Sequence, residues 1–210
     1  MSLDPQDLFA GENLAVMRGE RLLFKQVDFE LAAGQVLVLR GANGSGKTTL
    51  LRIMAGLTRP LVGDLTWGER PLAELPDFYR RHVAFVGHRP GLKDDLTPRE
   101  SLCFDARLRG VGPREAEQAL ESLGLESLAA LPAKLLSAGQ RRRVALARLA
   151  LGGAALWLLD EPATALDAAS EANLWRLCRD RLAEGARLVI ASHGTVPLAG
   201  RLTLAVDRNA

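Results

Sequence analysis

The residues with the most distinctive chemistry form one glycine-rich segment, which reads Gly41, Ala42, Asn43, Gly44, Ser45, Gly46, Lys47, Thr48, Thr49. It fits the phosphate-loop pattern GxxxxGK followed by Ser or Thr. Its glycines let backbone N–H groups curl around a phosphate, and a helix that begins at Lys47 adds partial positive charge. We expect Lys47 to reach the β- and γ-phosphates of a nucleotide and the Thr48 hydroxyl to bind Mg²⁺. The alternative, an ordinary glycine loop, requires the glycines, the lysine and the hydroxyl residue to coincide by chance.

Two acids, Asp160 and Glu161, follow the apolar stretch Leu156–Leu159. The carboxyl end of a buried parallel strand lies at the edge of the sheet where ligands bind. Asp160 is then placed to hold Mg²⁺, usually through water, and Glu161 to polarise the attacking water as a general base. The alternative is that the acids merely begin a loop. A phosphate loop about a hundred residues earlier favours the catalytic interpretation.

The flanking sequence predicts the elements that position these groups. Strands are predicted at Leu14–Val16, Val27–Leu31, Val36–Leu39, Val83–Val86, Ala155–Leu159 and Leu188–Ala191. Helices are predicted at Lys47–Ala55 with Gly56 as its cap, from Thr97 with a capping box to Glu100, and at Glu115–Leu123, Ala138–Leu151 and Ala168–Ala183. Alternating strands and helices indicate an α/β core with a parallel sheet, which a mostly helical segment interrupts.

The composition limits the possible classes of protein. Hydrophobic residues make up 48% and charged residues 25% of the 210 residues, as in an ordinary globular protein. A net charge of +2 is too small to predict a nucleic-acid surface, so no nucleic-acid partner is expected. Cys103 and Cys178 lie far apart in the sequence, which is typical of free thiols in a reducing cytoplasm.

No leader and no membrane span are predicted. The first ten residues contain Asp4 and Asp7 and no basic residue, unlike a signal peptide. The longest uncharged apolar run, Leu149–Leu159, is shorter than the roughly 20 residues that a membrane span needs. We therefore expect that the chain does not cross a bilayer alone.

The segment Leu136-Ser137-Ala138-Gly139-Gln140 resembles the LSGGQ signature of ABC ATPases, with Ala at the third place. The resemblance spans about Leu14 to His193. It implies a single ABC ATPase domain over residues 1–210, which is a P-loop NTPase core with an inserted helical subdomain. The core lobe is expected at residues 1–95 and 152–210, and the helical subdomain at about 96–151.

This resemblance assigns further site residues. Ser137, Gly139 and Gln140 are expected to bind nucleotide, although Ser137 is also a plain helix cap. Asp167 matches the acid of the D-loop, and His193 matches the switch histidine that contacts the γ-phosphate. The implied catalytic residues are Lys47, Glu161 and His193, and the cofactors are ATP and Mg²⁺. In this family ATP lies between the phosphate loop of one domain and the signature of another, so a homodimer on ATP binding is expected.

Two positions depart from the usual pattern of the family. Arg18 stands where an aromatic residue normally stacks on adenine, and a guanidinium can also stack on a purine. His88 stands where the family has the Q-loop glutamine, and its neutral ring can contact the metal or water. We therefore include Arg18 among the nucleotide-binding residues and His88 among the metal ligands. The alternatives are a solvated surface arginine and a loop histidine with no nucleotide role.

The segment Gly87–Lys93, with the short chain, is similar to the ATP-binding subunits of the cytochrome c biogenesis haem exporters. This resemblance implies an ATP-hydrolysing subunit that docks on a multi-span permease, peripherally on the cytoplasmic face of a bacterial inner membrane. The docking groove is expected at Thr97–Leu136 and the loop at His88. No direct haem binding is expected, because there is no CxxCH motif. An ABC transporter for another cargo, a non-transport ABC ATPase and a nucleotide-dependent scaffold remain alternatives, although Glu161 argues against a scaffold.

Overall fold

The computed structural model describes residues 7–74 and 76–206 of the chain. Residues 1–6, on which much of the no-leader prediction rests, lie outside the described residues. The predicted limits of the domain, residues 1 and 210, also lie outside the described residues.

Five strands form a parallel sheet in the order β6-β7-β8-β3-β9. They are β3 (Val36–Arg40), β6 (Val83–Val86), β7 (Leu156–Asp160), β8 (Arg187–Ala191) and β9 (Arg201–Ala205). The central strands β3, β7 and β8 are almost entirely buried, which explains why their sequences are continuous apolar runs. Because all five strands are parallel, their carboxyl ends share one edge of the sheet.

Four strands form a second, antiparallel sheet in the order β2-β1-β4-β5. They are β1 (Phe9–Arg18), β2 (Arg21–Leu31), β4 (Val62–Trp67) and β5 (Arg70–Pro71). Buried and exposed residues alternate along the second half of β2, so this sheet has one face in the core and one face outside it.

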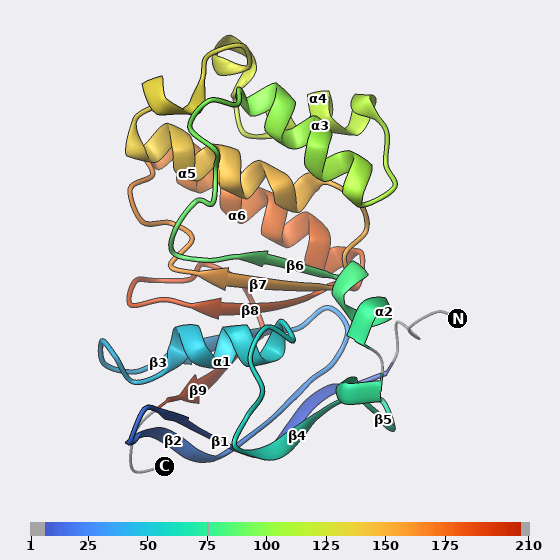
Figure 1. The fold of residues 1–210 in the computed structure, drawn as a ribbon, viewed down its shortest axis with the longest axis vertical. Helices are drawn as coiled ribbons and strands as arrows, with labels where there is room; N and C mark the ends of the chain where they lie inside the picture. The colour runs from blue at the N-terminus through green and yellow to red at the C-terminus, as the bar shows by residue number, and fades with distance from the viewer. Residues whose placement is uncertain (1–6, 75, 207–210) are drawn as a thin grey trace.

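Helix α1 (Lys47–Met54) lies between the two sheets (Figure 1). Leu50, Leu51, Ile53 and Met54 are buried, and they belong to one apolar cluster with residues of both sheets. The phosphate loop therefore joins the carboxyl end of a buried strand, β3, to the first turn of a buried helix, α1.

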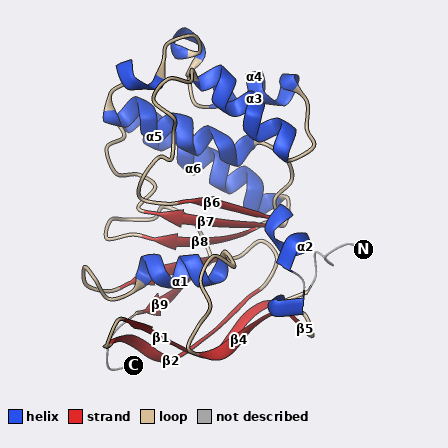
Figure 2. Cartoon of the chain, viewed as in Figure 1, coloured by secondary structure: helices blue, strands red, loops and turns tan. Residues whose placement is uncertain are grey.

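The remaining long helices lie on the other face of the parallel sheet (Figures 1 and 2). They are α3 (Pro98–Leu108), α4 (Pro113–Ser122), α5 (Ala138–Ala147) and α6 (Ala168–Ala183), whereas the short α2 (Pro76–Arg81) precedes β6. Short 3-10 turns occur at Leu72–Glu74, Glu126–Leu128, Ala133–Leu135 and Arg148–Ala150. Helices α3, α4 and α5 all fall between β6 and β7 in the sequence, and so interrupt the α/β core.

Several predicted elements agree with the structure and others need correction. The capping box at Thr97 and Glu100 is present, and the helix Ala168–Ala183 has the predicted limits. The helix predicted to reach Leu151 ends at Ala147 and continues as a 3-10 turn. Helix α1 is capped by Ala55, and Gly56 follows in a left-handed conformation with φ 67°. Helix α4 starts earlier than predicted, at Pro113, because proline suits the first helical position.

Four elements were not predicted: β4, β5, α2 and β9. Gly63 and Asp64 break the apolar pattern of β4, and β5 has two residues. Most residues of β9 are exposed at the edge of the sheet, so the strand has no apolar run to reveal it.

Candidate nucleotide site

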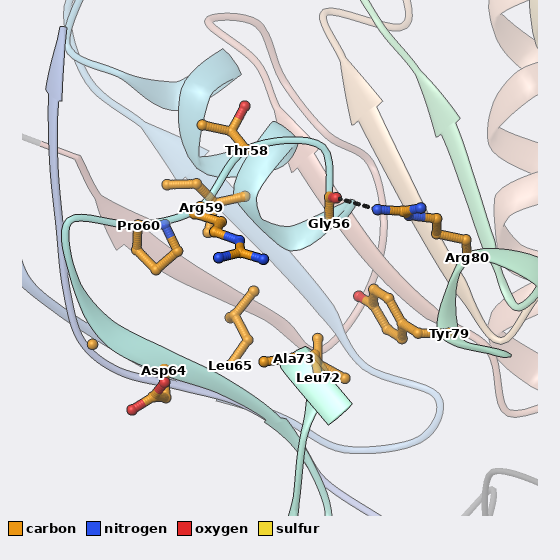
Figure 3. Close-up of a pocket in the computed structure, with 12 residues that line it drawn as sticks. Gly56, Thr58, Arg59, Pro60, Asp64, Leu65, Leu72, Ala73, Tyr79 and Arg80 are labelled. Atoms are coloured by element: carbon orange, nitrogen blue, oxygen red, sulfur yellow. Dashed lines mark hydrogen bonds between the residues drawn. The ribbon is translucent and has the colours of Figure 1, made fainter. Parts of the chain in front are cut away.

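One sizeable cavity of the described residues is lined by none of the predicted site residues. It has a volume of about 400 Å³ and lies between α1, β4 and α2. Gly56, Arg59, Tyr79 and Arg80 are among its lining residues, and Arg80 donates a hydrogen bond to the Gly56 carbonyl (Figure 3). Cavity size alone therefore does not locate the chemistry of this chain.

A second cavity of about 280 Å³ brings residues from distant parts of the sequence together. The predicted site residues that line it are Arg18, Asn43, Gly44, Gly46, Lys47, Thr48, Thr49, His88, Asp160, Glu161 and His193. Leu23 lines it as well, and sequence reasoning missed this residue. The sequence offers one signal for Leu23, which is its short separation from Arg18, the predicted adenine contact.

The phosphate loop joins β3 to α1 and requires glycine at two positions in particular. A Cβ atom on Gly41 would lie 2.4 Å from the Val206 carbonyl oxygen. A Cβ atom on Gly46 would lie 2.8 Å from the Phe24 ring, and its φ of 111° is also unfavourable for other residues. The loop is therefore held close to the β1–β2 hairpin and to the segment after β9.

The Lys47 ammonium lies inside this loop. Its Nζ atom donates hydrogen bonds to the carbonyl oxygens of Gly41 (2.7 Å) and Ala42 (3.1 Å). It also lies 3.2 Å from Nε2 of His193, which follows β8. Lys47 is only 8% exposed, so its charge is held within the loop by these contacts. This arrangement suits a phosphate group that would take over these contacts.

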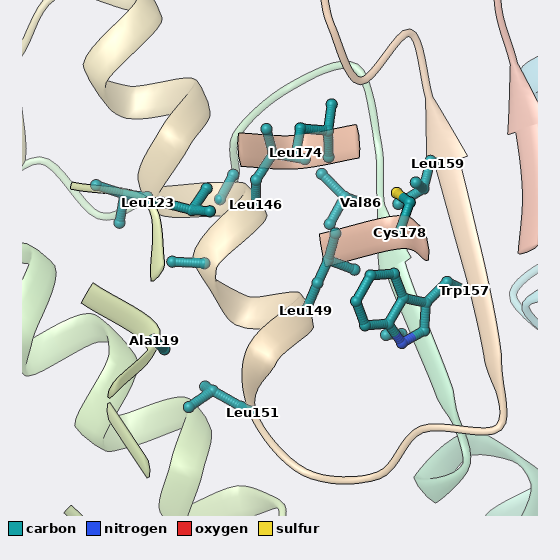
Figure 4. Packing of buried hydrophobic residues seen from close by; sticks show 14 of the residues in the cluster. Val86, Ala119, Leu123, Leu146, Leu149, Leu151, Trp157, Leu159, Leu174 and Cys178 are labelled. Carbon is teal, nitrogen blue, oxygen red and sulfur yellow. The ribbon is translucent and has the colours of Figure 1, made fainter. Parts of the chain in front are cut away.

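The Thr48 hydroxyl donates a hydrogen bond to Oδ2 of Asp160 at 2.8 Å. Packing fixes β7 beneath this pair, because Trp157 and Leu159 belong to the buried cluster with Leu174 and Cys178 of α6 (Figure 4). Among the described residues there is no group of three or more His, Cys, Asp or Glu that could hold a metal alone. One hydroxyl and one carboxylate nevertheless fit Mg²⁺, which is usually bound by one or two carboxylates with substrate phosphates and water.

Glu161 and His193 contact each other at the mouth of the same cavity. The backbone N–H of His193 donates to Oε1 of Glu161 at 3.1 Å, and His193 Nε2 lies 3.7 Å from that oxygen. Glu161 has a left-handed backbone with φ 48°, which is uncommon outside glycine and occurs often at functional sites. His88 is exposed and lines the cavity after β6.

The predicted signature residues lie elsewhere, around a third cavity of about 310 Å³. It is lined by Ser137, Gly139, Gln140, Arg143, Ala165, Leu166, Asp167 and Ser170. Ser137 and Gln140 form a reciprocal capping box at the start of α5. The signature cavity and the phosphate-loop cavity share no lining residue, so one chain does not bring its two predicted nucleotide contacts together.

Asp167 caps helix α6, and Gly139 permits close packing beside it. The Asp167 carboxylate accepts a hydrogen bond from the Ser170 backbone N–H at 2.7 Å, and this bond lowers the pKa of the carboxyl. A Cβ atom on Gly139 would lie 2.6 Å from the Ala165 carbonyl oxygen, so a larger residue would push α5 away from this loop.

Sequence reasoning also missed two arginines that hold the site. Arg40, at the end of β3, donates to the carbonyl oxygens of Ser192 (2.5 Å) and Gly194 (2.7 Å), on either side of His193. Arg142 of α5 is buried and donates to the backbone carbonyls of Asp160 and of Gly87, which precedes His88. Arg142 lies one helical turn before the buried Leu146, and this register is the signal that could have singled it out.

Comparison with known proteins identifies the class of protein that this fold and site define. Residues 24–164 match the ABC transporter family. The chain therefore belongs to this family and is an ATP-hydrolysing subunit of an ABC transporter. In such transporters the ATPase subunits bind ATP and work as dimers with membrane permeases.

Two relatives carry the same name, cytochrome c biogenesis ATP-binding export protein CcmA. The protein from Rhodospirillum rubrum is 45% identical over 95% of this chain and 86% of its own length. The protein from Nitrosococcus oceani is 45% identical over 93% of this chain and 90% of its own length. An ABC transporter ATP-binding protein from Pyrococcus furiosus, 24% identical, has the same fold with a TM-score of 0.82, covering 95% of this chain and 97% of its own. The predicted fold class, a P-loop NTPase core with an inserted helical subdomain, is confirmed.

Proposed function

We propose that the phosphate-loop cavity is the site of ATP hydrolysis, with a separate role for each charged residue. Lys47 binds the β- and γ-phosphates, and the phosphate loop supplies backbone N–H groups. Thr48 and Asp160 hold Mg²⁺, which neutralises phosphate charge when it is bound. Glu161 accepts a proton from the attacking water, and His193 contacts the γ-phosphate. The contact between Thr48 and Asp160, at 2.8 Å across 112 positions of sequence, is the observation that best supports this proposal.

Two variants test these roles. Each charge-assisted hydrogen bond contributes roughly 1.5–3 kcal/mol, so Lys47→Ala should weaken ATP binding and abolish turnover. Removing a general base costs about 10²–10⁴ in rate, so Glu161→Gln should bind ATP and hydrolyse it slowly. Isothermal titration with Mg-ATP and a phosphate-release assay measure both quantities. A normal rate in either variant would overturn the role proposed for that residue.

We further propose that the chain acts in cytochrome c biogenesis as the ATPase of a haem-exporting complex, peripherally on the cytoplasmic face of a bacterial inner membrane. The names of the two 45% identical relatives support this cargo and location. Among the described residues, no helix is both long and apolar enough to span a bilayer. We expect no haem binding by this chain itself, because the sequence has no CxxCH motif and the Cys178 thiol is fully buried.

The docking surface for this permease is the segment Thr97–Leu136 with the loop at His88. Large apolar side chains are exposed along this segment, and such groups are typical of a surface that binds a protein partner where they lie together. They are Phe104, Leu108, Leu131 and Leu135, of which Leu108 is 71% exposed. The proposed subdomain limits of about 96–151 include all four.

Deletion of the gene in its host tests the cargo. Haem staining should then show no c-type cytochromes, whereas b-type cytochromes persist. A plasmid copy of the parent chain should restore them, and the Glu161→Gln copy should not. Normal c-type cytochromes in the deletion strain would exclude haem delivery and leave the ATPase with another cargo.

A further inference from the structure

Arg142 lies on the buried side of the signature helix α5 and is only 5% exposed. Its guanidinium donates hydrogen bonds to five backbone carbonyl oxygens. These are the oxygens of Gly87 (2.7 Å), His88 (3.4 Å), Asp160 (2.6 Å), Glu161 (2.9 Å) and Pro162 (3.3 Å). One side chain of α5 therefore bridges the segments that follow β6 and β7.

Burial of the Arg142 charge costs free energy, and the geometry of its contacts suits an arginine in particular. Burial lowers the pKa of Arg142, and the nearby carboxylates of Asp160 and Glu161 partly offset this effect. A buried charge must be fully hydrogen-bonded, and here backbone carbonyls provide the partners. The planar fork of five N–H donors can satisfy several carbonyls at once, whereas a lysine ammonium is a point donor.

The bridged residues include the proposed base in its left-handed conformation. Glu161 has φ 48°, and such a backbone persists only when its surroundings hold it. Its N–H donates to the Ala191 carbonyl at 2.9 Å, and its carbonyl accepts from Arg142. Arg142, together with the Thr164 N–H, thus holds the peptide group that follows Glu161, and Ala191 of β8 holds the peptide group that precedes it.

We propose that Arg142 is a positioning residue, which aligns Glu161 and the turn at His88 with the signature helix. Its loss should slow hydrolysis and leave ATP affinity nearly unchanged, because Arg142 does not line the phosphate-loop cavity. The proposal rests on the proposed role of Glu161 as general base. The competing explanation is that Arg142 only stabilises the fold.

The test compares Arg142→Gln and Arg142→Lys with a matched control, Arg181→Gln. Arg181 of α6 is also largely buried and donates to a backbone carbonyl, that of Ala154 at 3.0 Å, but it lies outside the site. The kcat and KM for ATP are measured on membranes that carry the full transporter. Hydrogen–deuterium exchange and the melting temperature are measured on the purified full chain, which needs no turnover.

A misplaced catalytic group can cost about 10²-fold, so Arg142→Gln should lower kcat by roughly 10- to 100-fold with KM changed by less than about threefold. Arg142→Lys should recover part of this loss. Amide exchange should rise at residues 87–90 and 160–164 in the Arg142 variants and stay unchanged there in Arg181→Gln.

Two results would overturn the proposal. One is a kcat of Arg142→Gln that is no lower than the kcat of Arg181→Gln, when both variants have lost a similar amount of melting temperature. The other is unchanged exchange at residues 160–164. If instead Glu161→Gln hydrolyses ATP normally, the general-base role fails, and the exchange data still decide whether Arg142 holds this segment.

Discussion

Arg18 ends β1, and its exposed side chain lines the same cavity as the phosphate loop. Leu23 lines the same cavity, so the cavity wall includes one planar cation and one apolar group. Both suit a purine base, because a guanidinium can stack on an aromatic face and a leucine can cover apolar ring surface. We therefore propose Arg18 as the adenine contact, at the position where the family usually has an aromatic residue.

Substitution of Arg18 should therefore change nucleotide affinity. Stacking contributes roughly 0.5–2 kcal/mol, so Arg18→Ala should weaken ATP binding by up to about 30-fold, and Arg18→Tyr should restore it. Arg21, which pairs with Arg18 across the hairpin but does not line the cavity, provides the control variant Arg21→Ala. Titration calorimetry measures all three. Equal ATP affinities for Arg18→Ala and Arg21→Ala would show that Arg18 is a solvated surface arginine that does not contact adenine.

The two thiols should differ sharply in reactivity. Burial raises the pKa of Cys178 to about 12, whereas Cys103 is half-buried. Iodoacetamide at pH 8 should therefore alkylate Cys103 and spare Cys178 until the chain unfolds, as peptide mass spectrometry can show. The raised pKa also makes stability depend on pH, because the Cys178 thiol ionises more readily in the unfolded chain than in the folded one. Its contribution to the free energy of unfolding should be fully present below about pH 9 and should be lost between about pH 9 and 12. Alkylation of Cys178 in the folded chain would contradict this account.

At the scale of elements, the same local device occurs at the starts of α3 and α5. Thr97 with Glu100, and Ser137 with Gln140, form complete capping boxes. The first was predicted as a capping box and is confirmed, whereas Ser137 was predicted as a plain cap and its reciprocal bond with Gln140 is an addition from the structure. Only the second box lies at a proposed nucleotide contact, because Ser137 lines the signature cavity.

This pair separates a structural cap from a nucleotide contact. Loss of a cap costs about 1 kcal/mol, so Thr97→Ala and Ser137→Ala should lower the free energy of unfolding by similar amounts. Only Ser137→Ala should also reduce ATP hydrolysis. Denaturant melts and phosphate release on the two variants measure this. Equal ATPase rates would leave Ser137 with the role of a helix cap alone.

The sequence predicted elements well where local pattern and tertiary environment agree. The buried strands β3, β7 and β8 are apolar runs that no other environment explains, and the phosphate loop has a fixed pattern. Prediction failed for β9, a mostly exposed edge strand that pairs with β3 and packs only Leu204 against the core. It failed for Arg142 as well, because an arginine among three in a row is expected on a solvated face. The register of Arg142 one turn before Leu146 indicates its buried side of the helix, but not the distant backbone carbonyls that it binds.

At the scale of the whole molecule, the two nucleotide-facing surfaces are separate. The phosphate-loop cavity is bounded by the core strands and α1, and the signature cavity by the start of α5 and the loop before α6. If both contact ATP, they must do so across two copies of the chain. A twofold arrangement satisfies both sites at once, because each copy supplies one phosphate loop and one signature.

The Glu161→Gln variant should therefore accumulate as a dimer with two bound ATP molecules. Slow hydrolysis preserves the ATP that joins the copies, so size-exclusion chromatography with light scattering should show twice the 22.7 kDa chain mass in Mg-ATP and the single mass without it. Adding Ser137→Arg to this variant places a bulky charge on the exposed signature and should keep the chain monomeric, while titration calorimetry still finds one ATP per chain. A monomeric Glu161→Gln variant under saturating ATP would contradict the shared site. A dimer that survives Ser137→Arg would show that the copies meet through another surface.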